Sequence, residues 1–257
     1  MRPLLVRGLV VALAFAPSLV AAEDAPPAAP APDAPPAERK EPDPDAAGVP
    51  VALSVDFERA EKGALPDGFH VVAGRWTVVD DLLAPGRNHV LLQDATVPTW
   101  ATVLVRGGGH GYADGTASAR VLLVSGRDDA SGGIVFRARG PDDYYLVRMN
   151  ALEDNLRLYL VKHGVRWQLA TTTVTPPATG TWHALSVAFS GDTFRATLDG
   201  TSVVEAKDAT FSRGWCGLWT KSDSVTRFDD FVVTPTASAS TPPAPPAPAP
   251  KDPPAPR

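Results

Sequence analysis

The sequence has one cysteine, five scattered histidines and more acidic than basic residues, and each shortage excludes a class of protein. Cys216 cannot form an internal disulfide, and within WCGLW it reads as a small buried apolar residue. No pair of histidines has the spacing of zinc ligands. With 24 Lys and Arg against 29 Asp and Glu, the net charge is −5. This balance argues against nucleic acid or anionic lipid as the main partner.

Long helical patterns and internal repeats are also missing. Between Val51 and Pro235 the chain shows about fourteen short stretches in which apolar and polar residues alternate. Turn signals separate them, among them Gly140-Pro141-Asp142-Asp143, His163-Gly164 and Asp199-Gly200. An alternation with a period of two predicts strands. We therefore expect residues 51–235 to form one all-β domain, a jelly-roll sandwich of two stacked sheets.

The flanks of this domain have a different composition. Residues 1–22 combine Arg2 and Arg7 with a short apolar stretch and small residues before Glu23, the pattern of a cleaved signal peptide. Residues 23–50 and 236–257 hold 18 of the 27 prolines and are expected to be disordered, either as spacers or docking segments or simply as solvated tails. We expect export to the periplasm or the cell exterior, with no membrane span after cleavage.

The stretch from Ser131 to Val161 carries the candidate ligand-binding residues. If Ile134, Tyr145 and Leu158 face the core, alternation places a set of polar and aromatic residues on the outer side of the same sheet. This set comprises Arg137, Tyr144, Arg148, Asn150, Arg157 and Tyr159, with Trp167, Trp219, Lys221 and Asp223 as expected neighbours. Guanidinium groups and aromatic rings suit saccharides. The alternative is a solvated lattice of charges tied to acids such as Asp142 and Glu153.

The acidic residues suggest metal binding more than catalysis. Glycosidases need two carboxyl groups across one sugar bond, whereas Glu153-Asp154 and Asp229-Asp230 are neighbours that point apart on a strand. We assign no catalytic residue. If the first strand pairs with the last, Asp56 could meet Asp229 or Asp230 and help to hold a calcium ion. The alternative is a solvated sheet edge.

Several motifs, in this order along the chain, resemble a known group of folds. They are FERAEKGALPDGF, GRWTVVDD, GGIVFRAR, DYYLVRMNALEDNLRLYLV, TWHALSVAFSGDTFRATLDG and GLWTKSDSVTRFDDFVV. Together they resemble concanavalin A-like, laminin-G-like jelly rolls of exported bacterial proteins, nearest to the 3-keto-disaccharide hydrolase domain family. The resemblance implies this fold across residues 51–235.

Three functions remain open at this point. The first is a non-catalytic module that binds carbohydrate or another component of the cell surface. The second is a hydrolase or lyase that acts on the glycosidic bonds of 3-keto-disaccharides or related glycans, which only the resemblance implies. The third is a structural envelope domain that contacts another protein.

Overall fold

The computed structural model describes residues 43–44, 48–106 and 110–236. The expected signal peptide (1–22), most of the expected 23–50 linker and almost all of the 236–257 tail lie outside the described residues. The described residues form strands and turns without a helix, so none of them forms a helix able to cross a membrane.

The strands form two sheets in which all pairings are antiparallel. The eight-stranded sheet has the order β13 (Ser202–Lys207), β12 (Thr193–Leu198), β11 (Trp182–Ser190), β6 (Gly115–Ser125), β15 (Val225–Pro235), β4 (His89–Gln93) and β3 (Trp76–Asp80), and β1 (Leu53–Val55) pairs with β15. The seven-stranded sheet has the order β10 (Val165–Thr173), β9 (Asn155–Lys162), β8 (Tyr144–Asn150), β7 (Ser131–Ala138), β14 (Trp215–Lys221), β5 (Trp100–Val105) and β2 (Phe69–Ala73).

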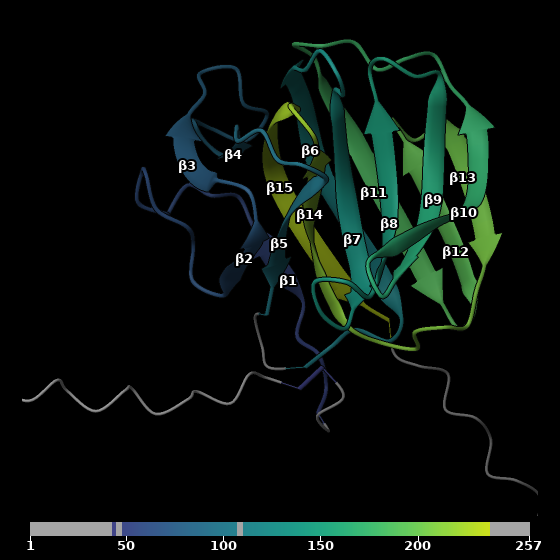
Figure 1. The fold of residues 1–257 in the computed structure, drawn as a ribbon. Helices are drawn as coiled ribbons and strands as arrows, with labels where there is room; N and C mark the ends of the chain where they lie inside the picture. The colour runs from purple at the N-terminus through teal and green to yellow at the C-terminus, as the bar shows by residue number, and fades with distance from the viewer. Residues whose placement is uncertain (1–42, 45–47, 107–109, 237–257) are drawn as a thin grey trace, which may run out of the picture. The chain divides into compact units, whose positions relative to one another are not determined.

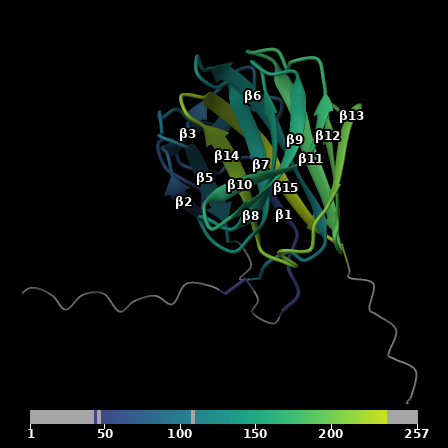
Figure 2. The same ribbon diagram turned by 45° about the vertical axis from the view of Figure 1, so that its right-hand side comes forward.

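The two sheets lie face to face. Figure 1 shows β7, β8 and β9 in front of β11 and β12, and the turned view in Figure 2 separates the two layers. The predicted all-β, two-sheet sandwich is therefore confirmed. The predicted pairing of the first and last strands is also confirmed, since Leu53 lies opposite Val233 and Val55 opposite Phe231.

Aromatic side chains join the two layers in the core. The ring of Phe136 on β7 lies 5.4 Å from that of Tyr145 on β8, and 5.4 Å and 5.1 Å from those of Phe189 and Phe194 on the opposite sheet. The ring centroids of Tyr145 and Phe194 are 4.5 Å apart. Such ring pairs add stability beyond the area they bury. The inward positions that alternation predicts for Phe136 and Tyr145 are therefore the positions that hold the sandwich together.

A tight turn sets the register at the edge of the seven-stranded sheet. His163 and Gly164 join β9 to β10 and both have positive φ angles, 51° and 71°. A two-residue turn of this kind matches the twist of the flanking strands. It pairs Lys162 with Val165, and hence Val161 with Arg166. The turn therefore places Arg166 on the same face as Val161.

A β-bulge in β7 overturns one prediction about the outer face. Opposite β14, the register shifts between Trp215 and Gly217, and Arg137 has a φ of 49°. A bulge inserts an extra residue and turns the side chains near it to the other face. Arg137 consequently points toward the eight-stranded sheet, and Ala138 takes the outward position in its place. The expectation that Arg137 faces outward was wrong.

Candidate functional site

The side of the seven-stranded sheet that faces away from the core carries a second cluster of buried side chains. We call this side the outer face. Its apolar part consists of Leu104, Val135, Ala138, Tyr144, Leu146, Tyr159, Val161, Trp215 and Trp219. Tyr144, Leu146 and Trp219 have no exposed surface. The outer face is thus largely buried rather than solvated, whereas the pairing of its arginines with Glu153, which the alternative predicted, is present at 2.9 Å and 3.0 Å.

Strand register arranges this face in rows. One row runs Thr102, Trp219, Gly133, Arg148, Arg157 and Thr171, and the next runs Leu104, Gly217, Val135, Leu146, Tyr159 and Gln168. In an antiparallel sheet, directly opposed residues project on the same side. Arg148, Arg157 and Tyr159 are therefore neighbours on one face, as the alternation of β8 and β9 predicts.

Three guanidinium groups surround the Tyr159 side chain. Arg148 and Arg157 each donate to the Tyr159 hydroxyl, at 3.4 Å and 3.3 Å. Arg166 stacks on the ring, with its guanidinium carbon 4.5 Å from the ring centroid. Cations over an aromatic face are attracted by the ring quadrupole. Tyr159, on the strand next to the sheet edge, thus has three arginines held against it.

Glu153 neutralises part of this charge. Its carboxylate accepts from Arg148 at 2.9 Å and from Asn155 at 2.9 Å, and it lies 3.0 Å from Arg157 Nη1. Burial raises the pKa of Glu153, but the hydrogen bonds from Asn155 and Arg148 and the charges of Arg148 and Arg157 outweigh it and lower the pKa to about 2. Glu153 is therefore a carboxylate at any ordinary pH.

A second polar group lies beside the first. Asn150 donates to Asp129 at 3.1 Å, and Lys221 forms an ion pair with Asp129 at 2.6 Å. Asp129 is 3% exposed, and the Lys221 side chain is 34% exposed. The outer face therefore ends in a partly exposed ammonium group anchored by a buried carboxylate.

Several buried polar atoms of the outer face have no hydrogen-bond partner among the residues that the structure describes. They are Thr102 Oγ1, the Tyr144 hydroxyl, Arg148 Nη1, Arg157 Nε, Arg166 Nη1 and Trp219 Nε1. The Tyr144 hydroxyl lies near Trp219 and Thr102 without normal hydrogen-bond geometry. Buried polar groups in native proteins are almost always satisfied. Six buried polar atoms on one sheet face that lack a partner in the described part of the chain therefore mark a place where a ligand could form hydrogen bonds.

Three of the predicted ligand-binding residues lie elsewhere. Arg137 is buried, donates to the backbone carbonyls of Ala113, Gly191 and Phe211, and lies 3.4 Å from Asp114. This network makes Arg137 part of the scaffold.

Trp167 and Asp223 also have other positions than predicted. Trp167 lies opposite Leu160, a core residue, so it projects from the other side of β10 and is 47% exposed. The Asp223 carboxylate accepts three backbone N–H groups, from Arg127 at 2.7 Å, Asp128 at 3.1 Å and Asp129 at 2.9 Å. These hydrogen bonds lower the Asp223 pKa to about 2, and its carboxylate shapes a loop.

The sequence analysis missed Arg166, although a signal for it was present, and it named Glu153 only as an acid of the alternative charge lattice. The two-residue turn at His163-Gly164 implies that Arg166, rather than Trp167, shares a face with Tyr159. Glu153 follows β8 in a turn, and nothing in the local sequence shows that its carboxylate folds back onto Arg148.

The acids expected to bind calcium do not form a metal site. Asp56 is exposed, and its carboxylate accepts from the backbone of Glu58 at 3.3 Å. Asp229 is buried, and accepts from the backbone of Asp230 at 2.8 Å and of Gly86 at 3.3 Å. Within the described ranges, no three His, Cys, Asp or Glu side chains group in a way that could hold a metal ion.

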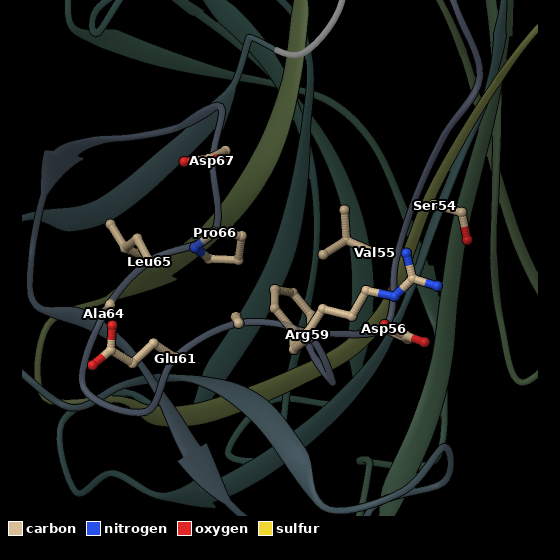
Figure 3. Close-up of a pocket in the computed structure, with 11 residues that line it drawn as sticks. Ser54, Val55, Asp56, Arg59, Glu61, Ala64, Leu65, Pro66 and Asp67 are labelled. Carbon is tan, nitrogen blue, oxygen red and sulfur yellow. The ribbon is translucent and has the colours of Figure 1, made fainter.

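A hollow beside β1 is a separate feature. It has a volume of about 440 Å³ and is lined by one continuous segment, Ser54 to Asp67, excluding Glu58, Lys62 and Gly63. Figure 3 shows Arg59 beside Ser54 and Asp56 on one side, and Glu61 and Asp67 on the other. None of the outer-face residues lines this hollow.

Comparison with known proteins identifies the fold but no family. No protein-family model matches the chain, and no curated protein matches its sequence. Among solved structures, the carbohydrate-binding module CBM66 from Bacillus subtilis is similar, with a TM-score of 0.54 and 21% identity over 64% of this chain and 93% of that chain. The fold is a two-sheet antiparallel jelly-roll sandwich, like that of these solved structures.

A second solved structure supports this assignment. A GH16 protein of a mixed-linkage glucan locus in Bacteroides ovatus, in complex with a G4G4G3G product, matches with a TM-score of 0.51. Identity is 8%, over 71% of this chain and 99% of that chain. At such identities the likeness concerns the jelly roll itself. The resemblance to the 3-keto-disaccharide hydrolase domain family stays a prediction.

Proposed function

We propose that this jelly roll is an exported, non-catalytic module that binds saccharide on the outer face of its seven-stranded sheet. The observation that carries the proposal is the state of Arg148, which is 3% exposed and has Nη1 without a hydrogen-bond partner among the described residues. A buried cation with an unused donor is costly unless something else satisfies it. Saccharide hydroxyls are acceptors that could do so.

The surroundings of Arg148 support the same proposal. Tyr159 and Trp219 contribute aromatic rings to this face, although both rings are buried in the free protein. The polar atoms of Tyr144, Trp219 and Thr102 that lack a hydrogen-bond partner among the described residues lie on the same face. Saccharide sites combine apolar surface with a few such polar groups. The similar structure CBM66 is, by its name, a carbohydrate-binding module. Export is proposed from the composition of residues 1–22.

The electrostatics of the outer face favour binding over hydrolysis. A glycosidase needs one carboxyl group that stays protonated near neutral pH. Glu153 has a lowered pKa, and Asp129 is paired with Lys221. The carboxyl group with a raised pKa, Asp229, lies on β15 in the other sheet. The acids on the outer face therefore suit structural roles.

Binding to a glycan panel, with Arg148→Ala and Arg157→Ala as variants, tests the proposal. We expect the wild-type protein to retain at least one glycan and each variant to weaken that binding by about tenfold or more, because each removes a charge-assisted donor. Arg195→Ala is the matched control, since Arg195 pairs with Glu205 on the other sheet.

Circular dichroism and thermal denaturation show whether the variants stay folded. Binding that is unchanged in folded Arg148→Ala and Arg157→Ala would refute the site. A co-purifying protein with no glycan retained would favour the envelope-interaction function. Release of sugar from 3-keto-disaccharides would favour the hydrolase.

A further inference from the structure

The charges around Tyr159 do not balance. Arg148 and Arg157 share one carboxylate, that of Glu153, at 2.9 Å and 3.0 Å. Arg166 has no carboxylate within ion-pair distance among the described residues. Together the three cations therefore have one carboxylate within ion-pair distance among the described residues, on a patch that is partly shielded from water, and the charge of Asp154 acts on Arg157 from farther away.

The imbalance is local and does not follow from composition. The whole chain carries five more acidic than basic residues, yet this part of the outer face carries more basic than acidic ones. The neighbouring pair of Lys221 and Asp129 is neutral and leaves the excess in place. A concentration of positive charge on an otherwise acidic protein attracts and orients anions.

Each of the three arginines also has an unused hydrogen-bond donor. These donors are Arg148 Nη1, Arg157 Nε and Arg166 Nη1, all buried and without a partner among the described residues. Guanidinium groups only donate, so the missing partner must supply acceptor atoms. Carboxylate and sulfate groups offer several acceptors in the planar or forked geometry that guanidinium groups match best.

Access to these donors requires side-chain movement. Arg148 is 3% exposed, whereas the Arg157 side chain is 29% exposed and Arg166 is partly exposed. Arg166 covers the Tyr159 ring at 4.5 Å and extends from β10, the edge strand of the sheet. A ligand that reaches these buried donors therefore has to shift the side chains around Tyr159 from their present positions.

We propose that the outer face is selective for acidic saccharides, with the carboxylate or sulfate of one sugar unit bound among Arg148, Arg157 and Arg166. This inference rests on the proposed function and names its ligand class. Neutral hydroxyls could satisfy the free donors, but they would leave the excess positive charge uncompensated. An anionic group accepts hydrogen bonds from these donors and also neutralises the charge.

Two matched pairs of polysaccharides test this selectivity in the full-length chain. The pairs are polygalacturonate with its methyl ester, and dextran sulfate with dextran. We expect the charged member of at least one pair to bind about tenfold more tightly or better, with affinity that falls as salt is raised from 20 to 300 mM. The Arg157→Gln and Arg166→Gln variants should each lose about tenfold toward that polymer.

The control is Arg195→Gln, which removes an exposed cation from the other sheet and should leave binding within twofold. Equal loss in this control would mean non-specific attraction and would overturn the proposal. Sodium sulfate that competes as well as the polymer at equal charge would overturn its saccharide part.

A further outcome separates this inference from the proposed function. If neutral and charged members bind equally and Arg166→Gln changes nothing while Arg148→Ala abolishes binding, acidic selectivity is wrong and the saccharide module stands. If no member of either pair and no glycan of the wider panel is retained, both are wrong.

Discussion

Two carboxyl groups show how strongly position changes the chemistry of one side chain. Glu153 lies among arginine and asparagine donors, and despite its partial burial its pKa falls to about 2. Asp229 is fully buried with only two backbone N–H donors, and burial, together with the nearby charges of Asp230 and Glu58, raises its pKa to about 6. The two pKa values differ because arginine charges offset the cost of burial at Glu153, whereas no such charge from the described residues offsets it at Asp229.

The Asp229→Asn variant should be more stable than the wild type at pH 7.5. A carboxyl group with a raised folded-state pKa binds a proton in the folded protein that the unfolded chain releases, so the wild type loses stability as pH rises from about 4 to 6. A pKa difference of about two corresponds to ~2.7 kcal/mol, from which weakened hydrogen bonds subtract about 1 kcal/mol.

Urea denaturation at pH 4 and pH 7.5 measures this effect. We expect a gain of about 1–2 kcal/mol at pH 7.5 that largely disappears at pH 4. Asp56→Asn, at an exposed acid, serves as the control. An equal change in stability at both pH values would contradict the assignment.

At the scale of single elements, the bulge in β7 has the largest effect on the site. It removes Arg137 from the outer face. The guanidinium group of Arg137 instead links the end of β7 to the backbone by hydrogen bonds to the carbonyls of Ala113, Gly191 and Phe211. Its guanidinium carbon lies 5.3 Å from the Phe194 ring and 5.6 Å from the Phe189 ring. The bulge thus separates a structural arginine from the three around Tyr159.

Replacing Arg137 by alanine should therefore reduce stability far more than replacing an exposed arginine such as Arg195. Three backbone carbonyls would lose their donor, and Asp114 would lose a buried counter-charge. We expect a loss of about 3 kcal/mol in the free energy of unfolding, measured by urea denaturation.

Arg195→Ala provides the comparison for this variant, with an expected loss below about 0.5 kcal/mol because its ion pair with Glu205 is exposed. If the partly destabilised Arg137→Ala protein still binds glycan with unchanged affinity, Arg137 is structural only. A stability loss no greater than that of Arg195→Ala would show that the hydrogen bonds of Arg137 do not stabilise the fold.

At the scale of the whole molecule, the last two strands lie inside the sheets. β14 lies between β7 and β5, and β15 lies between β6 and β4 (Figure 1). Both pairings join residues far apart in the chain, and such long-range pairings slow folding. The sandwich is therefore incomplete until the C-terminal strands have joined both sheets.

Cys216 on β14 should report on this completion. Its side chain is 1% exposed, and burial raises the pKa of the thiol to about 12, so the reactive thiolate is scarce in the folded protein. We expect no reaction with a disulfide reagent under native conditions, and modification at the rate of global unfolding in denaturant. Fast modification without denaturant would mean that β14 detaches locally.

The fold and part of the site could be predicted from local patterns. Alternation in β8 and β9 correctly placed Arg148, Arg157 and Tyr159 on one face, and the pairing of β1 with β15 was anticipated. Two wrong expectations, the outward orientation of Arg137 and the grouping of Asp56 with Asp229 and Asp230, depended on geometry that local patterns do not carry. The outer-face position of Trp167 was also wrong, although the turn at His163-Gly164 carried the signal that corrects it.

The sequence by itself determined which segments are strands and which side of each strand is apolar, because alternation and turn residues act within a few positions of the chain. Only the tertiary structure decided which polar side chains meet. The bulge that turns Arg137 inward exists because β7 pairs with β14, about 80 residues later in the chain. Glu153 forms ion pairs with both Arg148 and Arg157 because β8 and β9, which carry these arginines, lie side by side. Charge and burial at the site follow from these pairings, and so does the chemistry proposed for it.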